Sequence, residues 1–496
     1  MIEGVINILS ETARALHVPF NRIWGRVRRA SPRLIVAIGS ISMVVVACAP
    51  TDVFAPRTTS DVVGAPTNGA TSTVSPTTAV DANLKPITAE QGVSLVANAW
   101  LLFVNEYVEP MPHGPLLKAA WRGFELAAPG PKGASPEILG ADAQSDIDAF
   151  EAAYLEASGA IPGASPAHSA AAYAAIRGMV KEIGDCHTGF STPAQVAEAN
   201  QRQDGVVRFA GIGVRIKRKK GEPAIVSELI AGGSAGKAGL KPGDALTAVE
   251  GVDLAELALD DIAARIRGKE GSSVKITIQR PGEKAPRVIS VTRVAISENA
   301  VESRLVGGDR VAYVRMNGFS TAAQDQALAA IGTMQAKATK GVVLDLRTNG
   351  GGDLNVYLSF LSKFLKDGPF GFETSRKGDR IALGPDGSYV GLKVPLVVLV
   401  SDSTASAAEA FSAAVKQYGV AKIVGSQTAG CVGIGSRYGL PDGSAVAVTT
   451  RKLSGPKGEE LNRVGLTPDE VIDVTREELA AGKDPILDRA VKLLGA

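Results

Sequence analysis

Apolar runs separated by short polar turns mark the C-terminal half of the chain. Residues 341–347 and 396–400 are dominated by apolar, mostly β-branched side chains, a pattern that favours strands buried inside a sheet. A helical pattern follows the first run over residues 354–365, and small helix-tolerant residues follow the second run. The spacing therefore predicts two strand-turn-helix units of an α/β fold.

Ser406 falls at the strand-to-helix junction of the second unit. A serine in the first turn of a helix lies beside unpaired backbone amides and the positive end of the helix dipole, and both favour an oxyanion. Ser406 is therefore a candidate nucleophile. A serine cap on an ordinary helix is the alternative that this segment leaves open.

Three consecutive glycines, Gly350 to Gly352, form the turn of the first unit. Glycines let backbone amides approach a ligand closely, although such a turn also suits a phosphate or a simple change of direction. The turn does not end in Gly-Lys-Ser/Thr, which argues against a nucleotide-binding loop.

The N-terminal part of the chain has a different pattern. An apolar run at 34–47 follows arginines at 22, 26, 28, 29 and 33 and ends at Cys48. It is short for a membrane span and suits a signal peptide. A small residue followed by cysteine resembles a bacterial lipoprotein cleavage box, which predicts a signal peptide at 1–48 and a lipidated Cys48; a short signal anchor is the alternative.

Residues 49–86 are rich in Ser, Thr, Pro, Ala and Gly, which predicts a disordered tether. Residues 87–205 have a helical pattern, with helices expected over 93–108, 114–127 and 170–183 around a Gly/Pro/Ala-rich insertion at 129–169.

Residues 206–300 open with a glycine-rich turn, Gly211-Ile212-Gly213, and resemble a PDZ domain of the kind found in bacterial proteases. Over residues 90–475 the chain resembles the C-terminal processing, or tail-specific, serine peptidases. The motifs that carry this resemblance, besides the PDZ domain, are Tyr313-Val314-Arg315-Met316, Asp345-Leu346-Arg347 with its glycines, Thr404-Ala405-Ser406-Ala407 with Glu409, and Val464-Gly465-Leu466-Thr467-Pro468-Asp469.

The resemblance implies an α/β (α+β) peptidase core at 301–496, with an inserted PDZ domain and an N-terminal helical domain that delivers a histidine to the site. It makes Ser406 the nucleophile. It assigns oxyanion binding to the amides of Ala407 and of Gly351 or Gly352, and the binding of a peptide carboxylate to Gly211, Ile212 and Gly213.

The general base departs from the commoner pattern of the family. In its Ser-Lys members the base is a lysine, and the matching position here is Cys431, whose thiol is a poor base toward a serine hydroxyl. The segment around His187 resembles the family's Asp-x-His-Thr motif, and a branch related to the tricorn core peptidase uses a histidine from this region. We expect His187 to be the base, although Ser-Lys members carry this histidine without that role. The third catalytic residue of that branch is a glutamate, and the matching position here is Asn462, whose amide is expected to orient the imidazole. Glu459 and Glu460 lie two or three residues away, and an exposed loop asparagine is the alternative.

Only two cysteines remain after lipidation of Cys48, and both fall in presumed active-site motifs. The resemblance implies that these motifs face each other, so a disulfide between Cys186 and Cys431 is chemically sensible in an oxidising compartment. Two buried thiols are the alternative, since sequence does not establish their separation.

The amino-acid composition limits the kinds of ligand and partner that are expected. The chain has 53 Lys plus Arg against 51 Asp plus Glu, so nucleic acid is not an expected partner. The basic run from Arg215 to Lys220 is expected to be solvated. Four histidines and three cysteines show no zinc spacing, and neither a metal nor a cofactor is expected.

The sequence therefore predicts an exported serine endopeptidase, tethered to the membrane of a bacterial cell envelope, that captures a C-terminal or exposed segment of a polypeptide. The alternative is a catalytically silent PDZ scaffold, because Cys431 stands where the lysine is found.

Overall fold

The computed structural model describes residues 84–496 apart from 128–134, 139, 141, 160, 198–208, 219–220, 256, 258, 297 and 336–339. The predicted signal peptide, Cys48 and nearly all of the predicted tether lie outside the described residues. Among the helices that are described, none is long and apolar enough to cross a membrane. The described residues form two compact units, one within 84–184 and 436–448 and the other within 185–435 and 449–496.

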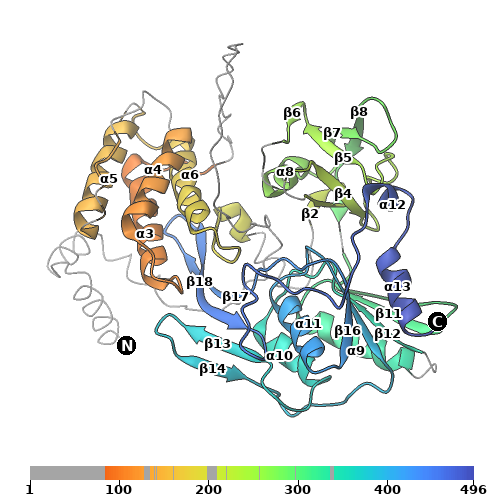
Figure 1. The fold of residues 1–496 in the computed structure, drawn as a ribbon. Helices are drawn as coiled ribbons and strands as arrows, with labels where there is room; N and C mark the ends of the chain where they lie inside the picture. The colour runs from red at the N-terminus through yellow and green to blue at the C-terminus, as the bar shows by residue number, and fades with distance from the viewer. Residues whose placement is uncertain are drawn as a thin grey trace, which may run out of the picture. The chain divides into compact units, whose positions relative to one another are not determined.

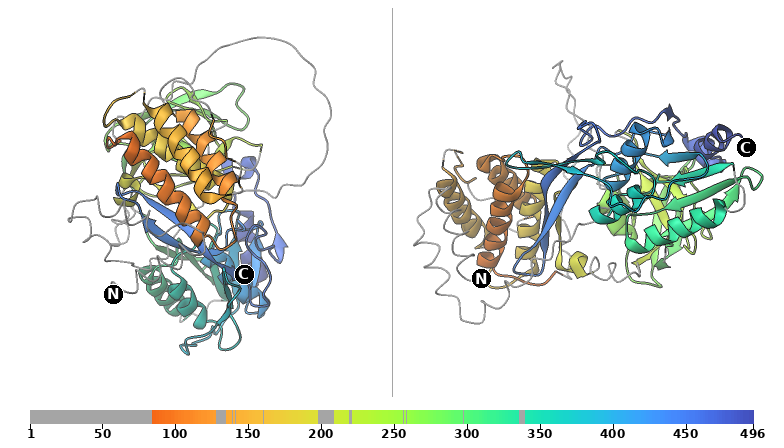
Figure 2. Two further views of the ribbon diagram at one scale, coloured as in Figure 1. Left: turned by 90° about the vertical axis from the view of Figure 1, so that its left-hand side faces the viewer. Right: turned by 90° about the horizontal axis from the view of Figure 1, so that it is seen from below.

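The first unit is built on four helices, α3 (Ala89–Glu106), α4 (His113–Ala127), α5 (Ala143–Ser158) and α6 (Pro166–Ile183), which lie side by side in Figures 1 and 2. Their apolar faces bury Phe103, Phe124, Phe150 and Ile176 completely. A Cβ atom on Gly123 of α4 would lie 2.2 Å from the Ala174 carbonyl oxygen of α6, so glycine allows this close helix crossing.

Helix α5 occupies part of the segment predicted as a Gly/Pro/Ala-rich insertion, so that prediction is wrong for residues 143–158. The Asp142 side chain accepts a hydrogen bond from the Ser145 amide at 2.8 Å and caps the helix. Ile147, Phe150 and Tyr154 then recur at helical spacing and are buried. The flanking glycines and prolines masked this short amphipathic pattern.

The centre of the second unit is a six-stranded sheet in the order β10-β11-β12-β15-β16-β19. The strand β10 (Val301–Val306) pairs antiparallel with β11 (Val311–Met316), and the remaining neighbours are parallel. These are β12 (Gly341–Asp345), β15 (Leu396–Val400), β16 (Ala421–Gly425) and β19 (Glu470–Val471).

Helices cover both faces of this sheet (Figure 1). Val342 and Leu344 face α9 (Thr321–Gln335), α10 (Leu354–Ser362) and α11 (Ala407–Gln417), whereas Val343 faces α13 (Pro485–Leu493). Burial on both faces explains the continuous apolar strands. The predicted fold class is confirmed.

A second sheet of the core has the order β1-β18-β13-β14, with β17 paired to β18. Its strands are β1 (Gly189–Ser191), β13 (Gly371–Ser375), β14 (Arg380–Leu383), β17 (Gly433–Gly439) and β18 (Ala445–Ser454).

The PDZ region has its own core and its own sheet, in the order β3-β4-β5-β7-β8, with the short β6 (Val252–Asp253) on β5. Its strands are β3 (Val214–Lys217), β4 (Ala224–Leu229), β5 (Ala245–Val249), β7 (Ser273–Gln279) and β8 (Arg287–Thr292). The region also contains the helix α8 (Leu259–Ile266) and a separate antiparallel pair, β2 (Phe209–Gly211) with β9 (Val294–Ile296). Strand β3 lies at the edge of its sheet.

Candidate active site

Ser406 lies between β15 and α11 in a backbone conformation that is unusual for a residue with a side chain, with φ 56° and ψ −121°. Such conformations cost free energy and persist where surrounding contacts enforce them. Here the Ser406 amide donates to the Cys431 carbonyl oxygen at 2.8 Å and to Glu409 Oε2 at 3.1 Å. This is the kind of sharp strand-to-helix turn that presents a nucleophilic serine.

Glu409 holds this turn against the segment that contains Cys431. Its buried carboxylate accepts hydrogen bonds from the Thr428 hydroxyl at 2.5 Å and from the Gly430 and Cys431 amides at 2.7 and 2.8 Å, as well as from Ser406. Burial raises the pKa of Glu409 and outweighs these hydrogen bonds, which lower it. Sequence reasoning missed this role, although a serine followed three residues later by glutamate is a capping-box signal.

His187 lies next to Ser406: its Nε2 is 3.2 Å from the Ser406 Oγ. His187 belongs to the same compact unit as Ser406, which begins at Asp185, and not to the helical unit that was expected to deliver the histidine. Asp185 holds the segment by accepting hydrogen bonds from the His187 amide and the Thr188 hydroxyl, both at 3.0 Å. Burial lowers the pKa of His187, while the charge of Asp185 raises it, and the net effect favours a neutral imidazole.

The other ring nitrogen of His187 faces sulfur. Cys186 and Cys431 form a disulfide with Cα atoms 5.9 Å apart, inside the range that such a bond requires. Their Sγ atoms lie 3.4 and 3.5 Å from His187 Nδ1. A Cβ atom on Gly433 would lie 3.4 Å from the same nitrogen, so a glycine completes the close packing around the ring.

Asn462 is not hydrogen-bonded to His187. Its Oδ1 accepts from the Val432 amide at 3.2 Å, which supports the backbone beside Cys431. Glu460 accepts from the Asn462 amide and Glu459 from the Lys457 amide, so neither of these carboxylates is directed at the imidazole by a hydrogen bond. Within the described part of the chain, the Nδ1 of His187 thus has sulfur partners and no carboxylate or amide partner.

The glycine-rich turn lies directly against Ser406. A Cβ atom on Gly351 would be 2.6 Å from the Ser406 Cβ and 3.1 Å from the Ala407 nitrogen. The Gly351 amide donates a hydrogen bond to Asn349 Oδ1 at 2.9 Å. The amides of Ala407 and Gly352 donate no hydrogen bond to any residue that the structure describes. Of the two glycines that were predicted for oxyanion binding, Gly352 is therefore the one with a free donor.

Two comparisons with known proteins bear on this arrangement. The profile of peptidase family S41 matches residues 310–472, and that of the PDZ domain matches residues 205–279. A carboxyl-terminal-processing protease of Picosynechococcus sp. is 32% identical over 303 residues, which cover 61% of this chain and 73% of that protein. The chain belongs to peptidase family S41.

Other similar proteins agree with this assignment. A carboxyl-terminal-processing protease of Synechocystis sp. is 30% identical over 328 residues, covering 65% of this chain and 76% of the relative. The solved structure of a photosystem II D1 C-terminal processing protease aligns with a TM-score of 0.56 and 26% identity, over 83% of this chain and 98% of that protein. The recognition of a tail-specific serine peptidase with a PDZ domain is confirmed.

The predicted carboxylate-binding loop of this S41 chain joins β2 to β3. The carbonyl oxygens of Ile212 and Gly213 accept hydrogen bonds from Ala235 at 2.8 Å and Ile230 at 2.9 Å. The amides of Ile212 and Gly213 donate to no group within the described ranges. Gly213 has φ 76°, and a Cβ atom there would lie 2.5 Å from the Gly233 Cα. Glycine therefore shapes a loop whose amides remain available.

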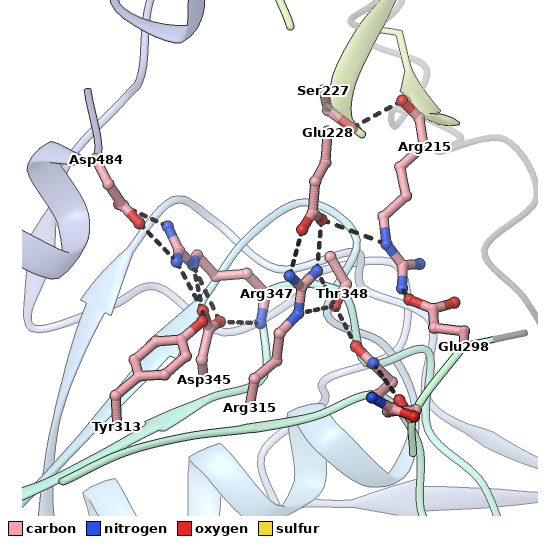
Figure 3. A network of polar contacts seen from close by, with 12 residues as sticks. Arg215, Ser227, Glu228, Glu298, Tyr313, Arg315, Asp345, Arg347, Thr348 and Asp484 are labelled. Carbon is pink, nitrogen blue, oxygen red and sulfur yellow. Dashed lines mark hydrogen bonds and ion pairs between the residues drawn. The ribbon is translucent and has the colours of Figure 1, made fainter. Parts of the chain in front are cut away.

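An ion-pair network joins the PDZ region to the peptidase core (Figure 3). Arg315 of β11 forms a two-bond pair with Glu228 of β4, which also pairs with Arg215 of β3. Arg315 further donates to the Thr348 hydroxyl at 3.0 Å, just before the glycine-rich turn. The expectation that the basic run is solvated is wrong for Arg215, and also for Arg218, which donates to backbone carbonyl oxygens near α8.

A second cluster in Figure 3 surrounds Asp345 at the end of β12. Its buried carboxylate accepts from Arg347 and, at 2.6 Å, from the Tyr313 hydroxyl, and Arg347 also pairs with Asp484. Burial raises the pKa of Asp345, but Arg347, Tyr313 and Arg315 together lower it to about 2. This carboxylate is therefore ionised at neutral pH and anchors the start of the Arg347–Gly352 turn.

Proposed function

We propose that this S41 chain is an active serine endopeptidase in which Ser406 is the nucleophile and His187 is the general base. The observation that carries the proposal is the 3.2 Å contact between His187 Nε2 and Ser406 Oγ at a strained strand-to-helix turn. A nucleophile within hydrogen-bond distance of a neutral imidazole is the arrangement that activates a serine. Although Cys431 occupies the position of the family's lysine, the site still has a general base, which is His187.

The reaction follows from these positions. Ser406 Oγ attacks the scissile carbonyl carbon while its proton passes to His187 Nε2. The amides of Ala407 and Gly352 stabilise the oxyanion, since both are free and lie on the two turns that meet at Ser406. The protonated imidazole then gives its proton to the leaving amine, and water, activated by His187, releases the acyl group.

The PDZ region supplies the substrate preference. The free amides of Ile212 and Gly213 suit a terminal carboxylate. Strand β3 is the edge strand of its sheet, which suits an extended peptide that adds as a further strand. The similar proteins named above process carboxyl termini. The substrates of this chain are therefore polypeptides captured by a C-terminal or an exposed segment.

The N-terminal sequence and the disulfide support a location on the outer side of a bacterial membrane. The sequence predicts a signal peptide cleaved at Cys48, a lipidated Cys48 and a polar tether, which agree with this location. The Cys186–Cys431 disulfide suits an oxidising compartment of this kind. Mature protein that begins at Cys48 and partitions with membranes is the expected finding, and an unmodified chain that starts upstream of Leu34 would contradict it.

A silent scaffold is the second candidate, and one observation favours it. The Nδ1 of His187 has sulfur neighbours where a carboxylate or amide commonly orients a catalytic imidazole. A scaffold would retain the PDZ loop and the core fold without turning over a substrate.

A fluorophosphonate probe, which reacts covalently with activated serines, separates the two candidates. The enzyme predicts labelling of wild-type protein that is lost in Ser406→Ala and strongly reduced in His187→Ala. Ser403→Ala is the matched control, because Ser403 lies in the same turn and its hydrogen bonds within the described residues go to Ser401 and Asp402. Folded wild-type protein that resists the probe would support the scaffold.

A further inference from the structure

Three side chains with metal-binding atoms meet beside Ser406: Cys186, His187 and Cys431. Their sulfur and nitrogen atoms all lie within 4.8 Å of one another. Cys186 and His187 are adjacent in sequence, but Cys431 is 245 residues from Cys186, so no spacing motif reveals the cluster. Sequence reasoning expected no metal for that reason.

The distances around His187 resemble those of a zinc site. Zinc–sulfur bonds of about 2.3 Å and zinc–nitrogen bonds of about 2.0–2.1 Å at a tetrahedral angle place sulfur and nitrogen ligands about 3.5 Å apart. The Cys186 and Cys431 sulfurs lie 3.4 and 3.5 Å from Nδ1 of His187. Once the disulfide is broken, the two sulfurs must separate to about 3.8 Å in the same geometry. The Cys431 sulfur also lies 4.0 Å from Nε2, so it lies beside the ring and must shift toward the lone pair of Nδ1 as it separates.

We propose that reduction of the Cys186–Cys431 disulfide converts these three residues into a binding site for a borderline-soft divalent cation such as Zn²⁺, and that the bound cation inhibits the peptidase. The cation-binding part rests on the geometry of the three side chains alone. The inhibitory part rests on the proposed function of His187.

The conversion needs a reductant, which is a dithiol. The dithiol donates two electrons and two protons, the disulfide bond breaks to give two thiols, and the dithiol becomes a cyclic disulfide. The cation then displaces both thiol protons and forms two bonds to sulfur and one to the lone pair of Nδ1. Two thiolates and an imidazole form a ligand set that suits Zn²⁺ and leaves one coordination position open.

Coordination at Nδ1 changes what the imidazole offers to Ser406. The proton of the neutral ring must then reside on Nε2, which lies 3.2 Å from the Ser406 Oγ. A protonated Nε2 has no lone pair for the serine proton, so the base is blocked. In the oxidised protein the sulfurs are bonded to each other, and the base stays free.

Cobalt titration tests the site without reference to activity. Full-length protein carrying Cys48→Ser, so that only the two active-site cysteines remain, is reduced with dithiothreitol, desalted without oxygen and titrated with Co²⁺. We expect a sulfur-to-cobalt charge-transfer band that saturates at one equivalent per chain, in reduced but not in oxidised protein. The same band is expected with Ser406→Ala, which keeps this test independent of catalysis.

Two further variants define the ligands. Cys431→Ser should abolish the band, and His187→Ala should weaken cobalt binding by at least about tenfold. Absence of the band in folded reduced protein, or equal affinity in His187→Ala, would overturn the site. Zn²⁺ added to the reduced protein should abolish fluorophosphonate labelling of Ser406. If cobalt binds and labelling persists, the site stands and the inhibition is rejected.

Discussion

At the scale of single residues, hydrogen bonds from neighbouring groups stabilise an unusual backbone conformation at Ser406 and a buried carboxylate at Glu409. Ser406 keeps a positive φ because its amide is held by the Cys431 carbonyl and by Glu409. Glu409 is buried with four hydrogen-bond donors around its two oxygens, so it positions Ser406 and the Cys431 segment together. At this scale the site is maintained by satisfied buried polar groups.

Asp345 provides a test of such a group through pH. Its pKa is about 2 in the folded chain against 3.8 ordinarily, so its ionised form stabilises the fold above about pH 4 and this stabilisation is lost as pH falls through 2. The shift corresponds to about 2 kcal/mol. Urea unfolding of wild type and Asp345→Asn should give a difference in unfolding free energy that is constant above pH 5 and shrinks by about that amount toward pH 2. A difference that does not change with pH would contradict the assignment.

Turns between strands and helices are the elements that form the site. The glycine-rich turn after β12 and the turn after β15 meet at Ser406, and both follow neighbouring parallel strands. Carboxyl ends of parallel strands share one edge of a sheet, which brings turns far apart in sequence into contact.

Gly352, in the turn after β12, is a position that requires glycine. It has φ 152°, and a Cβ atom there would lie 2.2 Å from the Phe319 carbonyl oxygen. Gly352→Ala should displace the free amide and lower kcat/KM by about 100-fold or more, the usual cost of losing an oxyanion donor. Gly384→Ala is the matched control, since a Cβ atom at Gly384 meets nothing within 4 Å. Equal kcat/KM values in the two variants would remove Gly352 from the proposed oxyanion site.

The loop between β2 and β3 is the second element with a testable role. If the amides of Ile212 and Gly213 hold a terminal carboxylate, a C-terminally amidated peptide should bind at least about tenfold more weakly than the free acid, equivalent to 1.4 kcal/mol. Calorimetry with the Ser406→Ala protein avoids cleavage during the measurement. Equal affinities would mean that the loop does not recognise a chain terminus.

The Cys186–Cys431 disulfide lies in the second unit and closes a loop between two cysteines that are 245 residues apart in sequence. That loop contains the entire PDZ region and most of the central sheet. The chain-entropy model gives about 5 kcal/mol as an upper figure for such a loop.

Thermal unfolding tests this contribution at the scale of the molecule. Reduction in the presence of a chelator, which removes any bound cation, should lower the unfolding temperature of the wild type. The Cys186→Ser/Cys431→Ser protein should unfold at a temperature that does not depend on reductant. An unchanged wild-type unfolding temperature after complete reduction would show that the disulfide adds no stability.

The sequence by itself determined the elements whose signal is local. Strand β12, strand β15 and the position of Ser406 follow from apolar runs that end in turn residues. The PDZ region was predicted from a resemblance to known PDZ domains that its glycines and strands carry. Helix α5 was not predicted, because its short amphipathic pattern lies between glycines and prolines.

Only the tertiary structure decided what the side chains of the site face. His187 and Ser406 are 219 residues apart, and the resemblance to the family, not any periodicity, suggested that they meet. The resemblance could not show that Asn462 accepts a hydrogen bond from the Val432 amide or that Glu409 accepts hydrogen bonds from four donors. Nor could it show that Nδ1 of His187 lies beside two sulfurs. Periodicity reports which face of an element is buried. The direction of a ring nitrogen depends on packing among segments hundreds of residues apart, and that packing exists only in the folded chain.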